Sequence, residues 1–290
     1  MYYNQKTIIY HNGKYVKPTE TKIDLYGQTL HYGNGVFEGI RAYNTTNGVT
    51  VFKAKEHYER LLKGAKAMQL NFKYTVDEMI KITYELLAKN NFTDAYIRPL
   101  ITTGASMALL SSEESTLTIQ TWEWGRLHGN DLLSMGTSSF QRPNPKSCFV
   151  ETKVTGHYIN SILAKNEAKK NGYNEALLLD MNENVAEASG ANIFIEKDGK
   201  LYTTAKGHIM AGITRNTIID ICKREGISIE EKIFTLEELK QADSAFLTGT
   251  AAEVAGVKNI DTYQFPLTWK KTLGYKLSKL YKEEIAKSNK

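Results

Sequence analysis

The sequence contains few of the features that mark membrane, secreted or metal-binding proteins. No apolar run in its 290 residues approaches the ~20 residues that a membrane-spanning helix needs, and the N-terminus has no signal-peptide architecture. The only two cysteines, Cys148 and Cys222, are isolated and have neither metal-ligand spacing nor the pattern of a disulfide framework. We therefore expect a protein of the reducing cytoplasm, with no membrane partner and no metal.

The sequence also lacks the concentrated basic stripe that nucleic-acid binding requires. Its 37 basic and 32 acidic residues give a formal net charge of +5 and are spread along the chain. Lysines are densest over 270–282, where Leu273, Leu277 and Leu280 recur at helical spacing. These lysines are better interpreted as the wet face of an amphipathic helix, so no nucleic-acid partner is expected.

Short strands, tight turns and amphipathic helices are what the sequence does contain. Asn-Gly pairs at 12–13 and 47–48, each between apolar arms, predict two β-hairpins. A strand is expected over 95–101, where Pro99 favours an edge position or a strand end because it has no N–H to donate. Apolar residues at helical spacing predict helices over 54–68, 76–89, 159–170, 214–225 and the C-terminus. We predict a mixed α/β fold with α+β character and many hairpins.

A loop rich in glycine and polar residues marks a boundary between two domains. Two ordinary domains fit within 290 residues. The expected division is a small N-terminal α/β domain over 1–124, an interdomain loop over 125–134 and a large C-terminal domain over 135–290.

Lys153 and Glu187 together have the chemistry that pyridoxal phosphate requires. A lysine amine condenses with the cofactor aldehyde, and a carboxylate keeps the pyridine nitrogen protonated. Lys153 lies just before Gly156 and an apolar-periodic helix, and such a strand-to-helix turn can project a partly desolvated amine into a cleft. Glu187 lies among small residues that let another group approach. Taken singly, however, Lys153 is more simply explained as a surface lysine, and Glu187 as a glutamate at the end of a strand.

Two small-residue turns and an arginine are suited to a phosphate group. Gly212 directly precedes a predicted helix, so the N–H groups of Ile213 and Thr214 lack intrahelical acceptors. A second turn follows an apolar strand at 248–253. Arg60 lies in a predicted helix, where a salt bridge with Glu56 is the alternative explanation.

Together these segments resemble the branched-chain amino acid aminotransferases, which are class IV, fold type IV pyridoxal phosphate (PLP) enzymes. The resemblance extends over nearly the whole chain and keeps the family order. The matching segments are residues 31–41, 56–61, 95–100, 155–161, 182–192, 212–215 and 248–253.

The resemblance implies a role for each residue of the cofactor site. Lys153 would form the internal aldimine and then carry the proton between the substrate Cα and the cofactor. Glu187 would pair with the pyridine nitrogen, and Tyr158 would hydrogen-bond the phenolic oxygen. The phosphate would be held by Arg60, by the backbone of Ile213 and Thr214, and by Thr250.

The same resemblance implies a substrate site. Tyr96 and the N–H groups of Thr250 and Ala251 would bind the α-carboxylate, and Arg98 would bind the distal carboxylate of 2-oxoglutarate or glutamate. The wall of the apolar pocket would consist of Phe37, Trp124, Tyr158 and Tyr32 of the partner subunit.

At the level of the whole protein, the resemblance implies a two-domain fold like that of D-amino acid aminotransferase. It also implies transfer of an amino group between branched-chain L-amino acids and 2-oxoglutarate. The expected assembly is a homodimer at least, and in some relatives dimers pair into hexamers.

Other activities remain alternatives. Aminodeoxychorismate lyase and D-amino acid transaminase share the fold, although the segments 37–41 and 96–98 favour the L-transaminase. A binding module without catalysis is the most distant alternative.

The chain departs from the family pattern at several positions. Leu127 and the stretch 104–110, which is poor in glycine, concern the substrate pocket, whereas Thr152 and His157 flank the Lys153 motif in place of alanine and asparagine. The amino-donor preference, the choice between dimer and hexamer, and the biosynthetic or catabolic direction therefore stay open.

Overall fold

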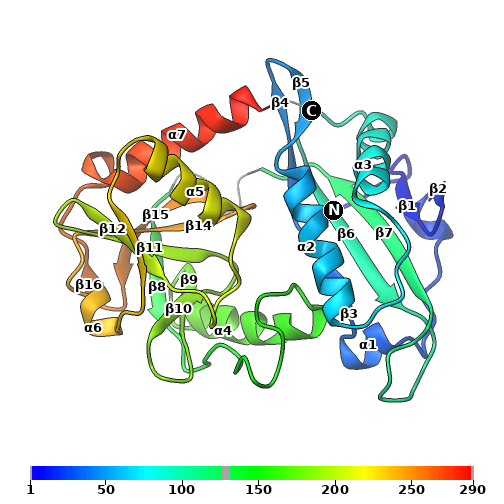
Figure 1. The fold of residues 1–290 in the computed structure, drawn as a ribbon, viewed down its shortest axis with the longest axis horizontal. Helices are drawn as coiled ribbons and strands as arrows, with labels where there is room; N and C mark the ends of the chain where they lie inside the picture. The colour runs from blue at the N-terminus through cyan, green and yellow to red at the C-terminus, as the bar shows by residue number, and fades with distance from the viewer. Residues whose placement is uncertain (1, 126–130, 289–290) are drawn as a thin grey trace. The chain divides into compact units, whose positions relative to one another are not determined.

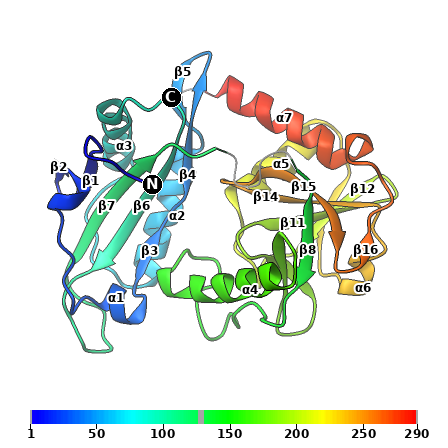
Figure 2. The ribbon, with the colours of Figure 1, turned by 180° about the vertical axis from the view of Figure 1, so that it is seen from behind.

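The computed structural model describes residues 2–125 and 131–288, and the chain divides into two compact units (Figures 1 and 2). The first unit contains residues 1–125, 152–157 and 285–290, and the second contains residues 126–151 and 158–284. The short segment that carries Lys153 therefore belongs to the unit built mainly from the N-terminal part of the chain. None of the described helices is long and apolar enough to cross a bilayer.

A seven-stranded sheet forms the first unit, in the order β2-β1-β7-β6-β4-β5 with β3 beside β6. Its strands are β1 (Ile9–His11), β2 (Lys14–Val16), β3 (Gly35–Phe37), β4 (Ile40–Thr45), β5 (Gly48–Val51), β6 (Ala95–Thr103) and β7 (Ser115–Trp122). All these pairings are antiparallel. Both predicted hairpins are confirmed, because β1 pairs with β2 and β4 pairs with β5.

Helices cover one face of this sheet and leave the other face open (Figures 1 and 2). The hydrophobic core lies between the sheet and the two long helices, where Leu61 and Leu86 pack with Ile97 and Ile101. Side chains alternate along β6, so Tyr96 and Arg98 point to the opposite, open face. The helical elements are η1 (Pro18–Glu20), α1 (Gln28–Tyr32), α2 (Ala54–Ala67), α3 (Val76–Asn90) and η2 (Thr155–His157).

The expectation that Pro99 lies at a sheet edge or at a strand end is wrong, because Pro99 is in the middle of β6. Strand β6 is interior, with β7 on one side and β3 and β4 on the other. Pro99 pairs with Ile119 of β7, and on its other side its carbonyl accepts a hydrogen bond from the Glu38 N–H at 2.9 Å. Because Glu38 and Gly39 lie between β3 and β4, the missing N–H of Pro99 falls where the ladder is already interrupted.

A nine-stranded sheet forms the second unit, in the order β10-β9-β8-β15-β14-β11-β12-β13 with β16 beside β15. Most pairings are antiparallel, but β8 runs parallel to β9 and β15, and β12 runs parallel to β13. The strands are β8 (Leu133–Thr137), β9 (Glu175–Leu179), β10 (Val185–Ala188), β11 (Asn192–Lys197), β12 (Lys200–Thr204), β13 (Ile229–Lys232), β14 (Ser244–Gly249), β15 (Glu253–Ile260) and β16 (Tyr263–Gln264).

The helices of the second unit follow the predicted spacing. The C-terminal helix buries Leu277 and Tyr281 and exposes Lys276, Lys279 and Lys282, as the amphipathic interpretation predicted. Helix α4 packs Ala164 and Ala168 against Ala176 and Leu178 of β9. The helices are α4 (Tyr158–Lys170), α5 (Ile213–Arg224), α6 (Leu236–Leu239), η3 (Trp269–Lys271) and α7 (Leu273–Lys287), which extends into the first unit.

Candidate active site

Backbone contacts attach the Lys153 segment to the first unit. The Phe37 N–H donates to the Lys153 carbonyl at 3.0 Å, and Val154 forms an antiparallel bridge with Val36. The Thr155 hydroxyl donates to the Gly33 carbonyl at 2.5 Å. These contacts continue the edge of β3 and fix the backbone on both sides of the lysine. The Lys153 amine lies 5.9 Å from the centre of the Phe37 ring, at the end of that strand.

Two glycines make room for this segment. Gly33 ends α1 in the left-handed region, with φ of 66°, and any Cβ there would overlap the backbone of Gly156. Gly64 lies on α2, where a Cβ would stand 2.8 Å from the Thr152 methyl carbon. The threonine that departs from the family pattern therefore packs against a helix position that has no side chain.

Arg60 is held by a buried carboxylate. Glu38 is fully buried and accepts hydrogen bonds from Arg60 Nε at 2.6 Å and Nη2 at 2.8 Å. Glu56, the alternative partner considered from the sequence, forms its ion pair with Lys53 at 2.8 Å. The guanidinium is thus oriented from the interior of the unit by Glu38.

His57 completes this cluster, with Nδ1 2.8 Å from Glu38 Oε2. Burial lowers the pKa of His57, with the nearby charges of Arg60 and Lys153 acting in the same direction and Glu38 opposing them. The ring is therefore neutral, and its Nδ1–H donates to the carboxylate. Burial opposes ionisation of Glu38, but Arg60 and His57 outweigh it and hold the pKa of Glu38 well below its ordinary value.

The open face of the first sheet carries the predicted substrate residues. Arg98 lies over the Phe37 ring, 4.6 Å from Cζ to the ring centre, and Nη2 donates to the Tyr96 hydroxyl at 3.4 Å. The Tyr96 and Trp124 rings are 4.9 Å apart, edge to face. Gly39 is required beside them, because a Cβ there would overlap the Tyr96 hydroxyl. The first unit thus brings together the predicted residues Phe37, Arg60, Tyr96, Arg98, Trp124 and Lys153.

The predicted partner residue Tyr32 has a surface side chain. It is on α1, about half exposed, and its hydroxyl donates to the Met107 carbonyl at 3.3 Å. Leu127 lies outside the described residues.

Glu187 lies in the second unit among polar partners. It is buried in β10 and accepts hydrogen bonds from Asn192 Nδ2 at 2.9 Å and the Met210 N–H at 3.3 Å. Arg142 forms an ion pair with it, with Nε 2.9 Å from Oε1. These contacts fix the orientation of the carboxylate and place the positive charge of Arg142 beside it.

Asn192 connects Glu187 to the turn that begins α5. Its Nδ2 donates to the Met210 carbonyl at 2.9 Å, and its Oδ1 accepts from the Gly212 N–H at 3.2 Å. Gly212 is the N-cap of α5 without a side-chain cap. The N–H groups of the first turn, including Ile213 and Thr214, therefore have no intrahelical acceptor.

The second predicted phosphate turn lies beside the same residues. Thr248 pairs with Asn192 across β14 and β11, and a Cβ on Gly249 would stand 3.4 Å from the Gly190 carbonyl oxygen. Thr250 and Ala251 follow in the turn to β15. The Thr248 hydroxyl is buried without a hydrogen-bond partner among the described residues. The second unit thus groups Glu187, Ile213, Thr214, Thr250 and Ala251 near one another, and Tyr158 begins its helix α4.

Four site residues were missed as functional candidates in the sequence. Glu38 and His57 lie inside the matching segments, and the three-residue spacing of His57 and Arg60 on one helix face was the available signal. Asn192 also lies inside a matching segment, but no spacing pattern pointed to Asn192 or Arg142, because their partners come from other elements.

Comparisons with known proteins identify the family of this chain. A family model described as amino-transferase class IV matches residues 35–260. A branched-chain-amino-acid aminotransferase of Pseudomonas aeruginosa is 39% identical over 280 residues, which cover 94% of this chain and 91% of that protein.

Solved structures are similar over nearly the whole chain. The branched-chain aminotransferase of Thermoproteus uzoniensis, crystallised with norvaline, has a TM-score of 0.93 and 35% identity, covering 97% of this chain and 95% of that one. The T.th. branched-chain amino acid aminotransferase, complexed with N-(5'-phosphopyridoxyl)-L-glutamate, has a TM-score of 0.89 and 35% identity over the same shares of both chains.

Proposed function

Since this chain belongs to the class IV aminotransferases, and among them to the branched-chain-amino-acid aminotransferases, we propose that it uses pyridoxal 5'-phosphate to transfer amino groups between Leu, Ile or Val and 2-oxoglutarate. Lys153 is the residue that binds the cofactor aldehyde. The observation that carries this proposal is the Lys153 amine over the Phe37 ring, in the unit that also contains the buried Arg60–Glu38–His57 cluster.

The described residues fit a phosphorylated pyridine. In the second unit, Glu187 suits the ring nitrogen, and the uncapped start of α5 with Thr250 suits the phosphate. The buried Thr248 hydroxyl has no partner among the described residues, which is the state expected of a group that meets a ligand. Tyr158 is assigned to the phenolic oxygen and Arg60 to the phosphate. A phosphopyridoxyl group is also what the similar T.th. structure contains.

The bound cofactor supplies an electron sink that makes the substrate Cα–H acidic. Lys153 would be the base that removes the proton from the substrate Cα and later gives it back, and general base catalysis of this kind typically contributes roughly 10²–10⁴-fold. Glu187, oriented by its ion pair with Arg142, would hold a proton on the pyridine nitrogen. The Arg60 guanidinium would bind the phosphate in a fixed orientation, because Glu38 accepts hydrogen bonds from one edge of it.

The substrate groups follow from the open face of the first sheet. Tyr96, with the N–H groups of Thr250 and Ala251, binds the α-carboxylate, and Arg98 binds the distal carboxylate of 2-oxoglutarate. Phe37 and Trp124 wall the apolar part. An apolar pocket discriminates by only about 1–3 kcal/mol per methylene, so the three branched-chain amino acids overlap as donors.

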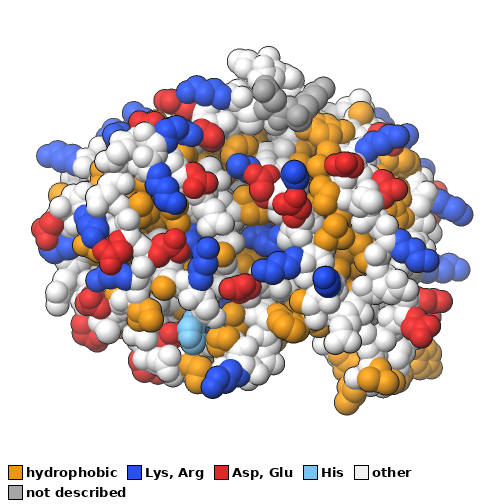
Figure 3. All heavy atoms as spheres, in the orientation of Figure 1, with side chains coloured by type: hydrophobic (Ala, Val, Ile, Leu, Met, Phe, Trp, Pro, Cys, Tyr) orange, Lys and Arg blue, Asp and Glu red, His pale blue; other side chains and the backbone are white. Residues whose placement is uncertain are grey.

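A homodimer is the assembly we propose. Apolar side chains gather where α1 and the 104–110 segment lie (Figure 3), and Leu25, Leu30, Leu109 and Leu110 are all more than half exposed. This set, which we call the α1 patch, also includes Tyr32, which would complete the pocket of the second copy. Covering so much exposed apolar surface is a common reason for association. The expected compartment is still the cytoplasm, with Cys148 and Cys222 as free thiols.

Spectroscopy and a donor panel test this proposal. The purified protein should absorb visible light, borohydride should bleach that band and fix the cofactor on the peptide that contains Lys153, and Lys153→Ala should abolish both. An active, coloured Lys153→Ala protein would overturn the assignment. L-Leu, L-Ile and L-Val should turn over with 2-oxoglutarate, whereas turnover of D-Ala alone or release of pyruvate from aminodeoxychorismate would favour the two rival activities.

A further inference from the structure

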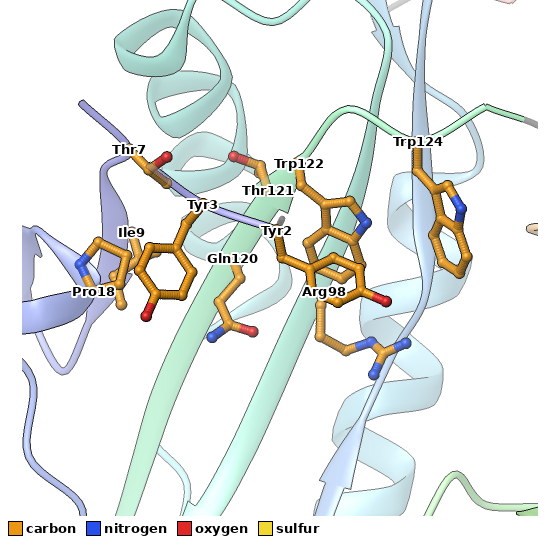
Figure 4. Close-up of a pocket in the computed structure, with 10 residues that line it drawn as sticks. All are labelled: Tyr2, Tyr3, Thr7, Ile9, Pro18, Arg98, Gln120, Thr121, Trp122 and Trp124. Atoms are coloured by element: carbon orange, nitrogen blue, oxygen red, sulfur yellow. The ribbon is translucent and has the colours of Figure 1, made fainter. Parts of the chain in front are cut away.

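A buried carboxylate that the proposed mechanism does not use lies at the start of β9. Glu175 is 3% exposed and belongs to the second unit, whereas the hollow drawn in Figure 4 belongs to the first. Its Oε1 accepts hydrogen bonds from the Ser189 hydroxyl at 2.5 Å and from the Ala176 N–H at 2.8 Å. Its Oε2 accepts from Lys165 Nζ at 2.6 Å. The two oxygens of one carboxylate thus bind two different elements of the unit.

The first of these elements is the turn that follows Glu187. Ser189 lies two residues after Glu187, between β10 and β11, and its N–H donates to the Ala176 carbonyl at 3.2 Å. Backbone and side chain of Ser189 are therefore both attached to the start of β9. The ladder between β9 and β10 is irregular between Val185 and Glu187, and such an irregularity changes the direction of nearby side chains. The bond from Ser189 to Glu175 therefore fixes the chain just after this break.

The second element is helix α4, which begins with Tyr158 and packs on β9. Lys165 follows Tyr158 by seven residues, or about two helical turns, so both lie on the same face of the helix. Lys165 Nζ also donates to the Asn174 carbonyl at 2.6 Å, directly before Glu175. These contacts restrict how α4 can rotate or slide on β9, and with it the position of Tyr158.

We infer that Glu175 is a positioning residue that holds Tyr158 and Glu187, the two proposed partners of the cofactor ring, at fixed relative positions. The inference rests on the proposed function, in which Glu187 meets the pyridine nitrogen and Tyr158 the phenolic oxygen. A buried ion pair adds little net stability compared with apolar packing, so the stability of the fold does not by itself account for the pair of Glu175 with Lys165. Its placement between the two elements that carry the ring partners does.

The pH at which the visible absorption of the holoenzyme changes tests the inference. A protonated pyridine nitrogen and a hydrogen bond donated to the phenolic oxygen both lower the pH at which the nitrogen of Lys153, joined to the cofactor, loses its proton. Loosening either contact therefore raises the pH of the change. Ser189→Ala and Glu175→Gln should each raise it by about 0.5–1 unit, a three- to tenfold change in that equilibrium.

Ser244→Ala and Glu196→Gln are the matched controls. The Ser244 hydroxyl donates to Glu196 Oε2 at 2.8 Å, and both residues are buried in the same sheet. Glu196 lies four residues along β11 from Asn192, which is about 13 Å in a strand. Both controls should lower the stability to urea about as much as Ser189→Ala and Glu175→Gln do, and should leave the pH of the absorption change as in the wild type.

A shift in Ser189→Ala no larger than in Ser244→Ala would overturn the inference, because any lost bond between a serine and a buried glutamate would then have the same effect. Should Glu175→Gln fail to fold, Ser189→Ala decides alone, since it removes one partly exposed hydroxyl and keeps the buried carboxylate. A wild-type protein without a visible band in the presence of pyridoxal phosphate overturns the proposed function and this inference with it. A normal wild-type band that neither variant shifts overturns the inference alone.

Discussion

In the interior of the first unit, the Glu38 carboxylate accepts hydrogen bonds from both a charged guanidinium and a histidine ring. It is fully buried and bonded to both Arg60 and His57. A charge in such a place is stable only while its partners remain. The residue therefore links the orientation of the proposed phosphate ligand to the stability of the whole unit.

Glu38→Gln should lower the free energy of unfolding by about 3–5 kcal/mol at neutral pH, because the Arg60 charge loses its buried partner. Urea denaturation measures this loss. The same substitution should weaken pyridoxal phosphate binding in equilibrium dialysis, since Arg60 is no longer oriented. Glu56→Gln, which removes only the partly exposed pair with Lys53, should stay within about 1 kcal/mol of the wild type.

The stabilising effect of Glu38 should depend on pH in a defined direction. Its pKa is lower in the folded protein than in the unfolded chain, so its contribution is present above the ordinary glutamate value of about 4.3 and is lost as the pH falls through the folded-state pKa. The stability gap between wild type and Glu38→Gln should therefore narrow as the solution is acidified. A gap that widens in acid would contradict this assignment of charge.

At the scale of elements, helix α2 can pack closely against the Lys153 segment because its residue at the contact, Gly64, has no side chain. Gly64 faces the Thr152 methyl group with no room for a normal Cβ contact. A glycine inside a helix ordinarily costs about 1 kcal/mol relative to alanine. Helix α2 thus has a residue of low helix propensity, Gly64, at the position where the Lys153 segment packs against it.

Gly64→Ala should accordingly destabilise the first unit by about 1–3 kcal/mol through overpacking, although propensity alone favours alanine. Thr152→Ala should remove the conflict, so that Gly64→Ala combined with Thr152→Ala recovers most of the loss in a double-mutant cycle measured by urea denaturation. Additive effects of the two substitutions would show that the contact is not the cause. Gly64 also affects the position of Lys153, so kcat should follow the same pattern.

In the second unit, Asn192 is the residue that joins two elements of the site. It bonds Glu187 of β10 and both Met210 and Gly212 at the start of α5. Asn192→Ala leaves the Gly212 N–H without this acceptor, at a cost of about 1–3 kcal/mol. We expect faster release of pyridoxal phosphate in dialysis with little change in far-ultraviolet circular dichroism; unchanged release would remove Asn192 from the site.

At the scale of the whole molecule, the α1 patch determines the expected assembly. Leu109 is 88% exposed, so Leu109→Glu should leave the folding stability of the isolated chain unchanged. It places a charge in the proposed interface. Light scattering after size exclusion should report a dimer for the wild type and a monomer, or a much weaker dimer, for Leu109→Glu. Ile233→Glu, at an exposed apolar position of the second unit, is the control and should remain dimeric.

The sequence predicted local structure well, because hairpins and amphipathic helices are determined by neighbouring residues. The fold class and the family are confirmed, whereas the roles of single residues remain predictions. The prediction for Pro99 was wrong because its missing N–H is tolerated at the break between β3 and β4. That break lies much earlier in the chain, so no local pattern around Pro99 indicates it. The pairing of Val36 with Val154 and the Arg142–Glu187 ion pair were equally invisible, since each joins residues that no local pattern relates.

The path of the chain through its units also has a consequence for synthesis on the ribosome. Residues 1–125 build most of the first unit, and β6 pairs with one edge of β3, but the opposite edge at Val36 and Phe37 receives its partners only from residues 153 and 154. Until that stretch has been translated and has returned, β3 presents unpaired N–H and C=O groups, which are templates for association with other nascent chains. The lysine segment therefore closes the first unit late, and a chain truncated at residue 125 would be a poor candidate for independent expression.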